Sequence, residues 1–485
     1  MPPGNSATTT RPPTLPSYLG GQAIADGPTL EVTYPWDNSV SGTVAMVSQA
    51  QAFACLENTL EKQRTEAPLT RYERHEILLK VRGLVEKHED AFAHLIRSET
   101  GLCMKETRYE AGRAKDVLQF AAMEALKDDG EIYSCDISPQ GKARKIFTFR
   151  KPLPVAFAIT PFNHPLNQVA HKIAPAVAAG VPMMLKPSEK TPLSAIRLCE
   201  LFYEAGLPEW MLSVFVGGID DVVEPLIKDE RIPLVTFTGG TRVGKHIASI
   251  AGYKKLCLEL GGNAPLIILP DADLDLAVKL ACEGNFRNSG QRCTAVKRTL
   301  VHKDIYEDFL TRFVDLAKTY TCGDPADDTT VVGTVIDEAA ATVLENRVKQ
   351  AVSDGATVLL GGNRNGAQIE PTVLRDVPRD TEMVATESFG PLAPVIPVDD
   401  LDDAIAYANA SDFGLSSAVV TNDMAAALRC VKEIDSGTTN INQVPGYRIE
   451  CSPFGGTKDS GLGIKEGVIE AIKFMTHIKT FSMPW

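Results

Sequence analysis

The sequence predicts an α/β protein with a mostly parallel sheet covered by helices. From residue 155 onward, short apolar segments alternate with longer segments of helical periodicity. At 485 residues the chain is too long for one ordinary hydrophobic core, so two or more domains are expected. Ligands of such sheets bind beyond the carboxyl ends of the strands, where functional residues should therefore lie.

Two helices are expected before this alternation. Thr70 and Glu73 form a capping-box pattern ahead of apolar residues at helical spacing. The pattern predicts a long helix that runs towards Gly101, where glycine would form the C-terminal cap, and a second helix over residues 105–124.

The central alternation forms a βαβ series. Strands are predicted over residues 155–160, 182–186, 211–216, 234–238 and 255–259, and helices over 167–179, 193–206, 220–228 and 241–251. Polar residues and a glycine lie at or just after the ends of these strands, namely Asn163, Lys186, Gly239 and Glu259. These positions are the first candidates for a functional site.

A second α/β segment is predicted over residues 262–460, with strands over 391–398 and 416–421 and helices over 305–317 and 337–353. The segments Tyr133–Lys151 and Phe474–Pro484 have extended character and could pair as a small separate sheet. We therefore divide the chain into a flexible tail over 1–18, a first domain of residues 19–132 and 152–261, a second domain of 262–460, and two outlying segments, 133–151 and 461–485.

Composition excludes several classes of function. The chain has 44% apolar and 23% charged residues, as soluble globular proteins do, and no apolar run of membrane-spanning length. Its 49 basic and 62 acidic side chains give a formal net charge of -13, which argues against nucleic acid as a partner. The ten cysteines show no CxxC pair or disulfide spacing, as expected of a cytoplasmic protein with reduced thiols.

The N-terminal residues Met1 to Tyr18 contain no apolar core of a secretory signal, so a flexible tail is expected there. Because this stretch also lacks acidic residues, a transit peptide stays open as an alternative.

The chemistry is carried by the segment Asn288-Ser289-Gly290-Gln291-Arg292-Cys293-Thr294. It places a cysteine beside small residues and a cation, a setting that could favour the thiolate and leave it accessible. A single cysteine is more often a small core residue. Segments distant in the sequence decide between a reactive cysteine and a core cysteine.

Those segments are Pro161-Phe162-Asn163-His164-Pro165, Phe237-Thr238-Gly239-Gly240-Thr241-Arg242-Val243-Gly244 and Leu258-Glu259-Leu260-Gly261-Gly262-Asn263. Lys186-Pro187-Ser188-Glu189 and Glu387-Ser388-Phe389-Gly390-Pro391 add to them. In this order and spacing, the motifs closely resemble the aldehyde dehydrogenase superfamily, from about residue 25 to the C-terminus. The resemblance implies the aldehyde dehydrogenase fold, with a Rossmann-like NAD-binding first domain, an α/β catalytic second domain and a small oligomerisation sheet.

The resemblance also implies catalytic roles. Cys293 would be the nucleophile that adds to the aldehyde carbon. The side-chain amide of Asn163 and the backbone N–H of Cys293 would hold the resulting oxyanion. Glu259 would be the general base that activates water for thioester hydrolysis, which disfavours acyl transfer to coenzyme A. The alternatives are that Asn163 only forms a turn and that Glu259 is a surface carboxylate. A different class of function would be a non-enzymatic binding or structural role.

The implied cofactor is NAD, and no metal is expected. The cofactor segments lack the ordinary six-residue glycine fingerprint, so phosphate binding would depend on the loop after Thr238. There Gly239 and Gly240 would let the backbone approach, and the helix that follows would offer free N–H groups. Most family members have serine in place of Gly240, so one phosphate hydrogen bond could be missing.

The remaining cofactor contacts come from side chains. Lys186 would reach the adenosine ribose, and a carboxylate at Glu189 would repel a 2′-phosphate, which favours NAD over NADP. Glu387 and Phe389 would hold the nicotinamide ribose and ring. The alternative is that Glu387 is a carboxylate at a strand edge and Phe389 a side chain of the core.

Three residues point to an anionic aldehyde, namely Arg113, His164 and Arg292, because cations near the reacting carbon suit phosphate-like oxygens. Each could instead serve local structure. Tyr447 and Arg448 lie in the family's late substrate loop and could add contacts. Among anion-selective members, the runs around Asn163 and Cys293 most resemble the phosphonoacetaldehyde dehydrogenases. Non-phosphorylating glyceraldehyde-3-phosphate, sulfolactaldehyde and lactaldehyde dehydrogenases stay open.

The expected partners are a small anionic aldehyde and further copies of the chain, and neither nucleic acid nor a membrane is expected. The resemblance implies a homodimer or homotetramer that assembles through the segments Tyr133–Lys151 and Phe474–Trp485.

Overall fold

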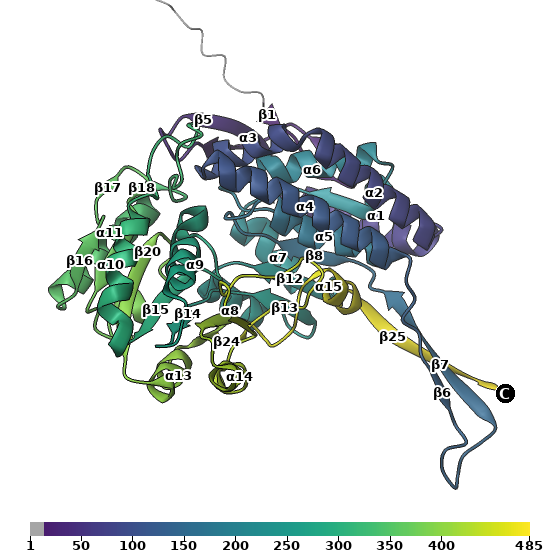
Figure 1. The fold of residues 1–485 in the computed structure, drawn as a ribbon. Coiled ribbons are helices and arrows are strands. Elements are labelled where there is room, and N and C mark those ends of the chain that lie inside the picture. Colours follow the sequence, from purple (N-terminus) through teal and green to yellow (C-terminus); the bar gives the residue numbers. More distant parts are fainter. Residues whose placement is uncertain (1–13) are drawn as a thin grey trace, which may run out of the picture.

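The computed structural model describes residues 14–485, which form two large sheets covered by helices and a projecting arm (Figure 1). The predicted α/β class is confirmed. The two sheets have seven strands each, and most of their neighbouring strands are parallel.

The first sheet has the order β13-β12-β8-β9-β10-β2-β3. Its strands are β13 (Lys255–Glu259), β12 (Leu234–Thr238), β8 (Ala156–Ile159), β9 (Met183–Lys186), β10 (Leu212–Val214), β2 (Ser17–Leu19) and β3 (Gln22–Ile24). The first five run parallel, so their carboxyl ends meet at one edge, as the βαβ pattern predicts.

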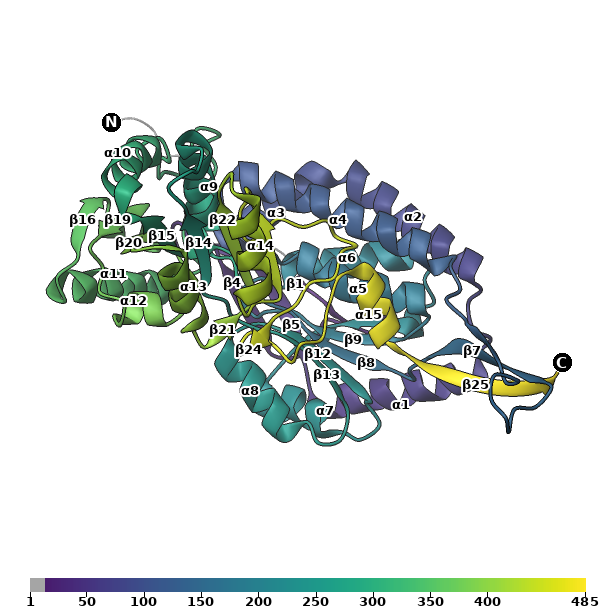
Figure 2. The same cartoon turned by 60° about the horizontal axis from the view of Figure 1, so that its bottom comes forward.

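Helices cover both faces of this sheet. One core joins it to α2 (Arg71–Lys87), α3 (Glu89–Thr100), α4 (Met104–Ala125), α5 (Asn167–Ala179) and α6 (Leu193–Glu204). The other joins it to α1 (Gln49–Thr65), α7 (Glu224–Lys228) and α8 (Thr241–Ile250). Figure 2 shows α8, α7 and α1 on the opposite side of the sheet from α4 and α2.

The second sheet has the order β16-β19-β20-β15-β14-β22-β23. Its strands are β16 (Thr357–Leu360), β19 (Thr372–Arg375), β20 (Leu392–Val398), β15 (Val296–His302), β14 (Ala264–Ile268), β22 (Ser416–Val420) and β23 (Thr438–Ile441). One face packs against α9 (Leu274–Phe286) and α10 (Tyr306–Ala317), and the other against α11 (Glu338–Ser353), α13 (Leu401–Asn409) and α14 (Met424–Glu433).

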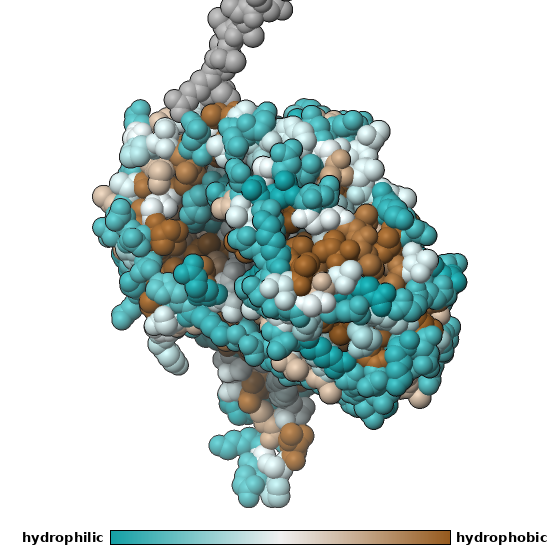
Figure 3. Space-filling view, turned by 90° about the vertical axis from the view of Figure 1, so that its left-hand side faces the viewer, coloured by the Kyte–Doolittle hydropathy of each residue, from teal (hydrophilic) through white to brown (hydrophobic). Residues whose placement is uncertain are grey.

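The arm consists of β25 (Thr476–Pro484), which pairs antiparallel with β7 (Arg144–Pro152), and β6 (Ile132–Ser134) at the edge of β7. The predicted pairing of the two outlying segments is therefore confirmed. The arm projects from the body (Figures 1 and 2) and carries exposed apolar side chains, which include Ile132, Tyr133, Ile478, Phe481 and Trp485. Apolar patches on it are visible in Figure 3. Its role in oligomerisation stays a prediction.

The remaining elements are short. They are β1 (Thr14–Leu15), β4 (Thr29–Thr33), β5 (Val40–Val47), β11 (Val216–Gly217), β17 (Arg364–Asn365), β18 (Gln368–Ile369), β21 (Phe413–Gly414), β24 (Thr457–Lys458), α12 (Glu382–Ala385), α15 (Val468–Phe474), a π-helical turn over Ile219–Val223, and 3-10 turns over Glu209–Met211, Arg287–Gly290 and Lys303–Ile305. Among residues 14–485, no helix is long and apolar enough to cross a membrane.

Two local predictions need correction. The expected long helix from Thr70 breaks at His88, where ψ of 19° departs from helical geometry and acidic residues start a new helix, although its capping box and the left-handed cap at Gly101 are present. The expected tail over 1–18 is too long, because Thr14 and Leu15 pair with β5 and Ser17 begins β2. Residues 1–13 of that expected tail lie outside the described part of the chain.

Candidate active site

Cys293 lies between two cavities. The first, of about 280 Å³, is lined by α4, by the turn after α9 and by the loop over residues 443–454. The second, of about 480 Å³, is lined by the loops after β8 and β12 and by Glu387 and Phe389. Asn163, Gln168 and Cys293 line both cavities. The thiol therefore stands where ligands in the two cavities would meet.

A left-handed turn carries the cysteine. Asn288, Ser289 and Gly290 have φ of 58°, 51° and 69°. A side chain at Gly290 would also place its Cβ 2.1 Å from the carbonyl oxygen of Gly390, so only glycine fits there. Left-handed residues with side chains cost roughly 1–2 kcal/mol each, and surrounding contacts must offset this.

Hydrogen bonds hold the turn against Asn163. The side-chain amide of Asn163 donates to the carbonyl oxygen of Gln291 at 2.9 Å, and the amide of Asn288 donates to the carbonyl oxygen of Asn163 at 3.1 Å. An asparagine amide has two N–H donors, so one remains for an oxyanion near Cys293. Asn163 therefore lines both cavities with Cys293, and its role with an oxyanion stays a prediction.

The electrostatics of Cys293 differ from the sequence-based expectation. Burial raises the pKa of the thiol to about 12, and Glu387 adds to the increase, whereas Arg448 acts in the opposite direction. The neighbouring Arg292 does not pair with the sulfur, because its guanidinium donates to the carbonyl oxygens of Glu283 and Gly284 at 2.8 and 2.9 Å. The expected local preference for the thiolate is therefore wrong, because the effect of burial on the pKa exceeds that of the nearby cations.

Glu259 ends β13 and is only 3% exposed. Neither of its carboxylate oxygens has a hydrogen-bond partner among residues 14–485, and the side chain lies against Gly455 outside the lining of both cavities. Burial raises its pKa well above the ordinary value, and the nearby carboxylate of Glu466 adds to this. Glu259 must turn towards Cys293 before it can act on a water there.

The second cavity presents groups that could bind a phosphate and a nicotinamide ring. At its edge Gly240 is the N-cap of α8 and has open space at its Cβ position. Because no side chain caps this end, the first N–H groups of the helix are available to a phosphate. The hydroxyl of Thr238 is buried and has no hydrogen-bond partner within the described part of the chain, residues 14–485. Glu387 accepts a hydrogen bond from the backbone N–H of Gly262 at 3.0 Å, and the ring of Phe389 lines the same space.

Lys186 and Glu189 lie beside this cleft at the end of β9. Lys186 is 3% exposed and pairs with Glu189, whose side chain is 40% exposed. The charge of Glu189 is therefore already shared with a cation, which weakens the expected repulsion of a 2′-phosphate.

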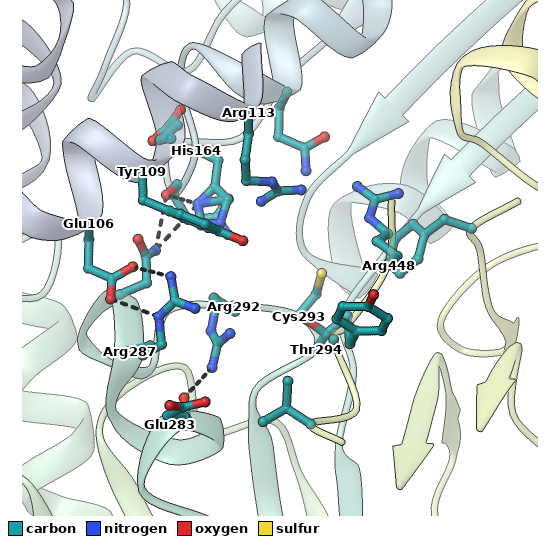
Figure 4. A pocket seen from close by; sticks show the side chains of 18 of the residues that line it. Glu106, Tyr109, Arg113, His164, Glu283, Arg287, Arg292, Cys293, Thr294 and Arg448 are labelled. Carbon is teal, nitrogen blue, oxygen red and sulfur yellow. Dashed lines mark hydrogen bonds and ion pairs between the residues drawn. The ribbon is translucent and has the colours of Figure 1, made fainter. Parts of the chain in front are cut away.

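Arginines surround Cys293 in the first cavity (Figure 4). Arg113 projects from α4 and its Nε lies 2.5 Å from Oε1 of Glu450, which leaves its terminal nitrogens free of that bond. Arg448 stacks on the ring of Phe454 at 4.0 Å and lies 4.0 Å from Glu450. Arg292 has no ion pair with a carboxylate among residues 14–485, and burial lowers its pKa only to about 10, so it stays charged.

Two other residues predicted for this cavity, His164 and Tyr447, also line it, but His164 differs from the prediction in its charge. His164 lines it, but burial, together with Arg113 and Arg292, holds its pKa well below 6.5. The expectation of a positive charge at His164 is therefore wrong at neutral pH. Tyr447 lies on the lining with 57% of its surface exposed, as a rim residue would.

Sequence reasoning missed several residues of the site. Arg287 lines the first cavity, and its Nε and Nη2 donate to the two carboxylate oxygens of Glu106 at 2.9 and 3.0 Å, with its guanidinium against the ring of Tyr109. Glu450 and the buried Lys297 were also missed. Arg287 precedes Cys293 by one short turn, and this proximity was the available signal.

Comparison with known proteins gives the family. The model described as the aldehyde dehydrogenase family matches residues 23–481. The chain belongs to this family. It is an oxidoreductase that acts on aldehydes, as the motifs around Cys293, Glu259 and Asn163 indicated, and its fold is the aldehyde dehydrogenase fold.

Similar proteins are named as dehydrogenases of particular aldehydes. The chain is 38% identical to the 3-sulfolactaldehyde dehydrogenase of Priestia aryabhattai, over 93% of this aldehyde dehydrogenase and 91% of that protein. It is 37% identical to the sulfoacetaldehyde dehydrogenase of Neptuniibacter caesariensis, over 93% and 99%. The structure of the glyceraldehyde-3-phosphate dehydrogenase GapN of Methanocaldococcus jannaschii complexed with NADP matches with a TM-score of 0.91 and 33% identity, over 95% and 100%.

Proposed function

We propose that this aldehyde dehydrogenase oxidises a short anionic aldehyde to the carboxylate through a thioester on Cys293, with phosphonoacetaldehyde as the candidate substrate. The observation that supports the proposal is that two of the arginines around Cys293 lack a close carboxylate partner in the described chain. Arg113 and Arg287 each have a close carboxylate partner, whereas Arg292 has none in the described chain and Arg448 only a distant one.

An enclosed cation without a counter-ion is costly, and an anionic ligand would offset that cost. Guanidinium groups bind tetrahedral anions through pairs of N–H donors. The cavity of about 280 Å³ suits a substrate of a few heavy atoms. Phosphonate, sulfonate and phosphate share the required chemistry, and the names of the similar enzymes support this class.

The reaction would begin when the thiol of Cys293 gives its proton to solvent and the sulfur attacks the carbonyl carbon. The free N–H of Asn163 and the backbone N–H of Cys293 would stabilise the negative oxygen, and donors of this kind are worth about 10²–10³ in rate. Collapse of this adduct expels a hydride and leaves a thioester. Glu259, once turned towards the sulfur, would take a proton from the water that releases the carboxylate.

A nicotinamide dinucleotide would supply the hydride acceptor. Thr238, Gly239, Gly240 and the start of α8 would hold its phosphates, Lys186 and Glu189 the adenosine ribose, and Glu387 and Phe389 the nicotinamide end. We propose NAD as the preferred form. Because Glu189 is paired with Lys186, we expect a moderate rather than a strict preference for NAD over NADP.

The test compares kcat/KM for phosphonoacetaldehyde, sulfoacetaldehyde, 3-sulfolactaldehyde, glyceraldehyde 3-phosphate, lactaldehyde and propanal. Arg448→Met and Arg292→Met should lower kcat/KM for the preferred anion by tens to thousands of times, since losing one partner of a desolvated charge pair costs about 2–5 kcal/mol. Propanal is the internal control and should change far less. Equal losses on both substrates would show that the arginines only support the loop, and a best rate with lactaldehyde or propanal would overturn the anion assignment.

A further inference from the structure

Lys297 is a buried cation on the strand that follows Cys293. It lies near the start of β15, is 1% exposed, and donates a hydrogen bond from Nζ to the carbonyl oxygen of Gly290 at 2.8 Å. On its other side, Nζ lies 5.3 Å from the centre of the Phe389 ring, which lines the cofactor cleft. The ammonium therefore contacts both the turn that presents Cys293 and the wall of the cleft.

The turn needs this contact. Gly290 is the third residue of the left-handed turn, and its conformation leaves its carbonyl oxygen pointing into the interior, where Lys297 is its donor. A buried carbonyl without a donor costs about 1–3 kcal/mol. Without Lys297, the orientation of Gly290, and with it that of Cys293, would be less well determined.

A hydrogen bond alone would not require a charge. Burial lowers the pKa of Lys297 to about 8, so the side chain is mostly charged at pH 7 despite the cost of burial. Two nearby groups favour the charged form of Lys297, namely the carboxylate of Glu387 and the thiolate of Cys293. Arg292 and Arg347 face it with the same sign as its own and oppose its charge.

The charged groups around Cys293 act on its thiolate in opposite directions. Glu387 and Glu259 disfavour its thiolate, whereas Arg448 and Lys297 favour it. Arg448 stands in the substrate cavity, where an anionic ligand would occupy its charge. Lys297 is outside that cavity and keeps its charge available when a substrate is bound.

We propose that Lys297 is a positioning residue that holds the Gly290 turn and supplies the positive charge that stabilises the Cys293 thiolate. The inference rests on Cys293 being the nucleophile, as proposed above. It does not depend on which aldehyde is oxidised.

The experiment measures alkylation of Cys293 by iodoacetamide in the full-length protein between pH 6 and 10, without aldehyde or cofactor. Peptide mass spectrometry separates Cys293 from the other nine cysteines of the chain. Lys297→Gln keeps a donor for Gly290 and removes the charge, whereas Lys297→Met removes both. Arg298→Met is the matched control, because Arg298 is a buried cation of the same strand that instead donates to the carbonyl oxygens of Asn263, Tyr407 and Ala408.

At pH 7, where Lys297 is mostly charged, Lys297→Gln should slow alkylation of Cys293 by about tenfold, and the difference should shrink above pH 8, where Lys297 itself loses its proton. Lys297→Met should do the same and also lower Tm. Arg298→Met should lower Tm and leave the profile unchanged. A Lys297→Gln profile that superposes on the wild type, or an equal slowing in Arg298→Met, would overturn the proposal. Because no aldehyde is used, this outcome is independent of the substrate panel.

Discussion

Nε of Arg113 and Oε1 of Glu450 lie 2.5 Å apart and join α4 to the loop that borders the substrate cavity. Glu450 also accepts from Nε2 of His171 at 2.6 Å, and its side chain is only 5% exposed. Its pKa is lowered, although burial opposes this, because His171 and Arg113 favour the carboxylate. Glu450 is thus a buried anion that keeps Arg113 in place beside Cys293.

Replacing Glu450 should be strongly destabilising. Breaking a buried pair by removing one partner costs about 3–5 kcal/mol, so Glu450→Ala should lower the free energy of unfolding by that amount in urea titrations. The double variant with Arg113→Met should recover part of the loss. Glu433→Gln, which removes the exposed i,i+4 partner of Arg429, is the control and should have little effect. Additive losses in the double variant would contradict a direct Arg113–Glu450 interaction.

Cys293→Ala should abolish dehydrogenase turnover, because the sulfur must bond to the aldehyde carbon before hydride can leave. Dinucleotide binding should persist, and intact-mass measurements should find the acyl adduct only on the wild type. Cys322→Ala, at a partly exposed cysteine outside the lining of both cavities, should retain turnover. Near-normal activity of Cys293→Ala would exclude it as the nucleophile.

Glu259→Gln should leave acylation intact and slow deacylation by about 10²–10⁴. Stopped-flow traces should then show a burst of reduced cofactor followed by a slow steady state. Since burial raises the pKa of Glu259, the basic form grows as pH rises, and the wild-type steady-state rate should rise through a pKa above 4.5. The glutamine variant should lack that rise. An equally slow first turnover would give Glu259 an additional role.

His164 should act as a neutral side chain. Its pKa lies well below 6.5, so raising the pH from 6 to 8 does not change its charge. The ratio of wild-type to His164→Gln kcat/KM for phosphonoacetaldehyde should stay constant across that range. A ratio that declines as pH rises would restore the cationic histidine expected from sequence.

NAD should give a higher kcat/KM than NADP, and Glu189→Gln should narrow the difference. The replacement removes the carboxylate near the expected 2′-phosphate and frees the ammonium of Lys186 to bind it. Dissociation constants for both cofactors, measured by fluorescence quenching, separate binding from turnover. A wild-type preference for NADP would contradict this assignment.

Much of the architecture follows from local pattern. The strands over Leu234–Thr238 and Lys255–Glu259 and the helix over Asn167–Ala179 have the predicted bounds, because apolar periodicity and glycine positions are local properties of the chain. The break at His88 was missed, since the packing of α3 and α4 against each other overrides a continuous helical pattern.

By itself, the sequence determined the α/β class, the family and the identity of Cys293, Asn163 and Glu259 as the residues to test, because spacing and residue type survive without coordinates. Only the tertiary structure decided their electrostatic state. The pKa of His164 is lowered, Arg292 turns to backbone carbonyls, Glu189 is paired, and Lys297 donates to the turn that carries Cys293. A side chain's charge and partners depend on burial and on groups distant in sequence, and the fold alone brings those together.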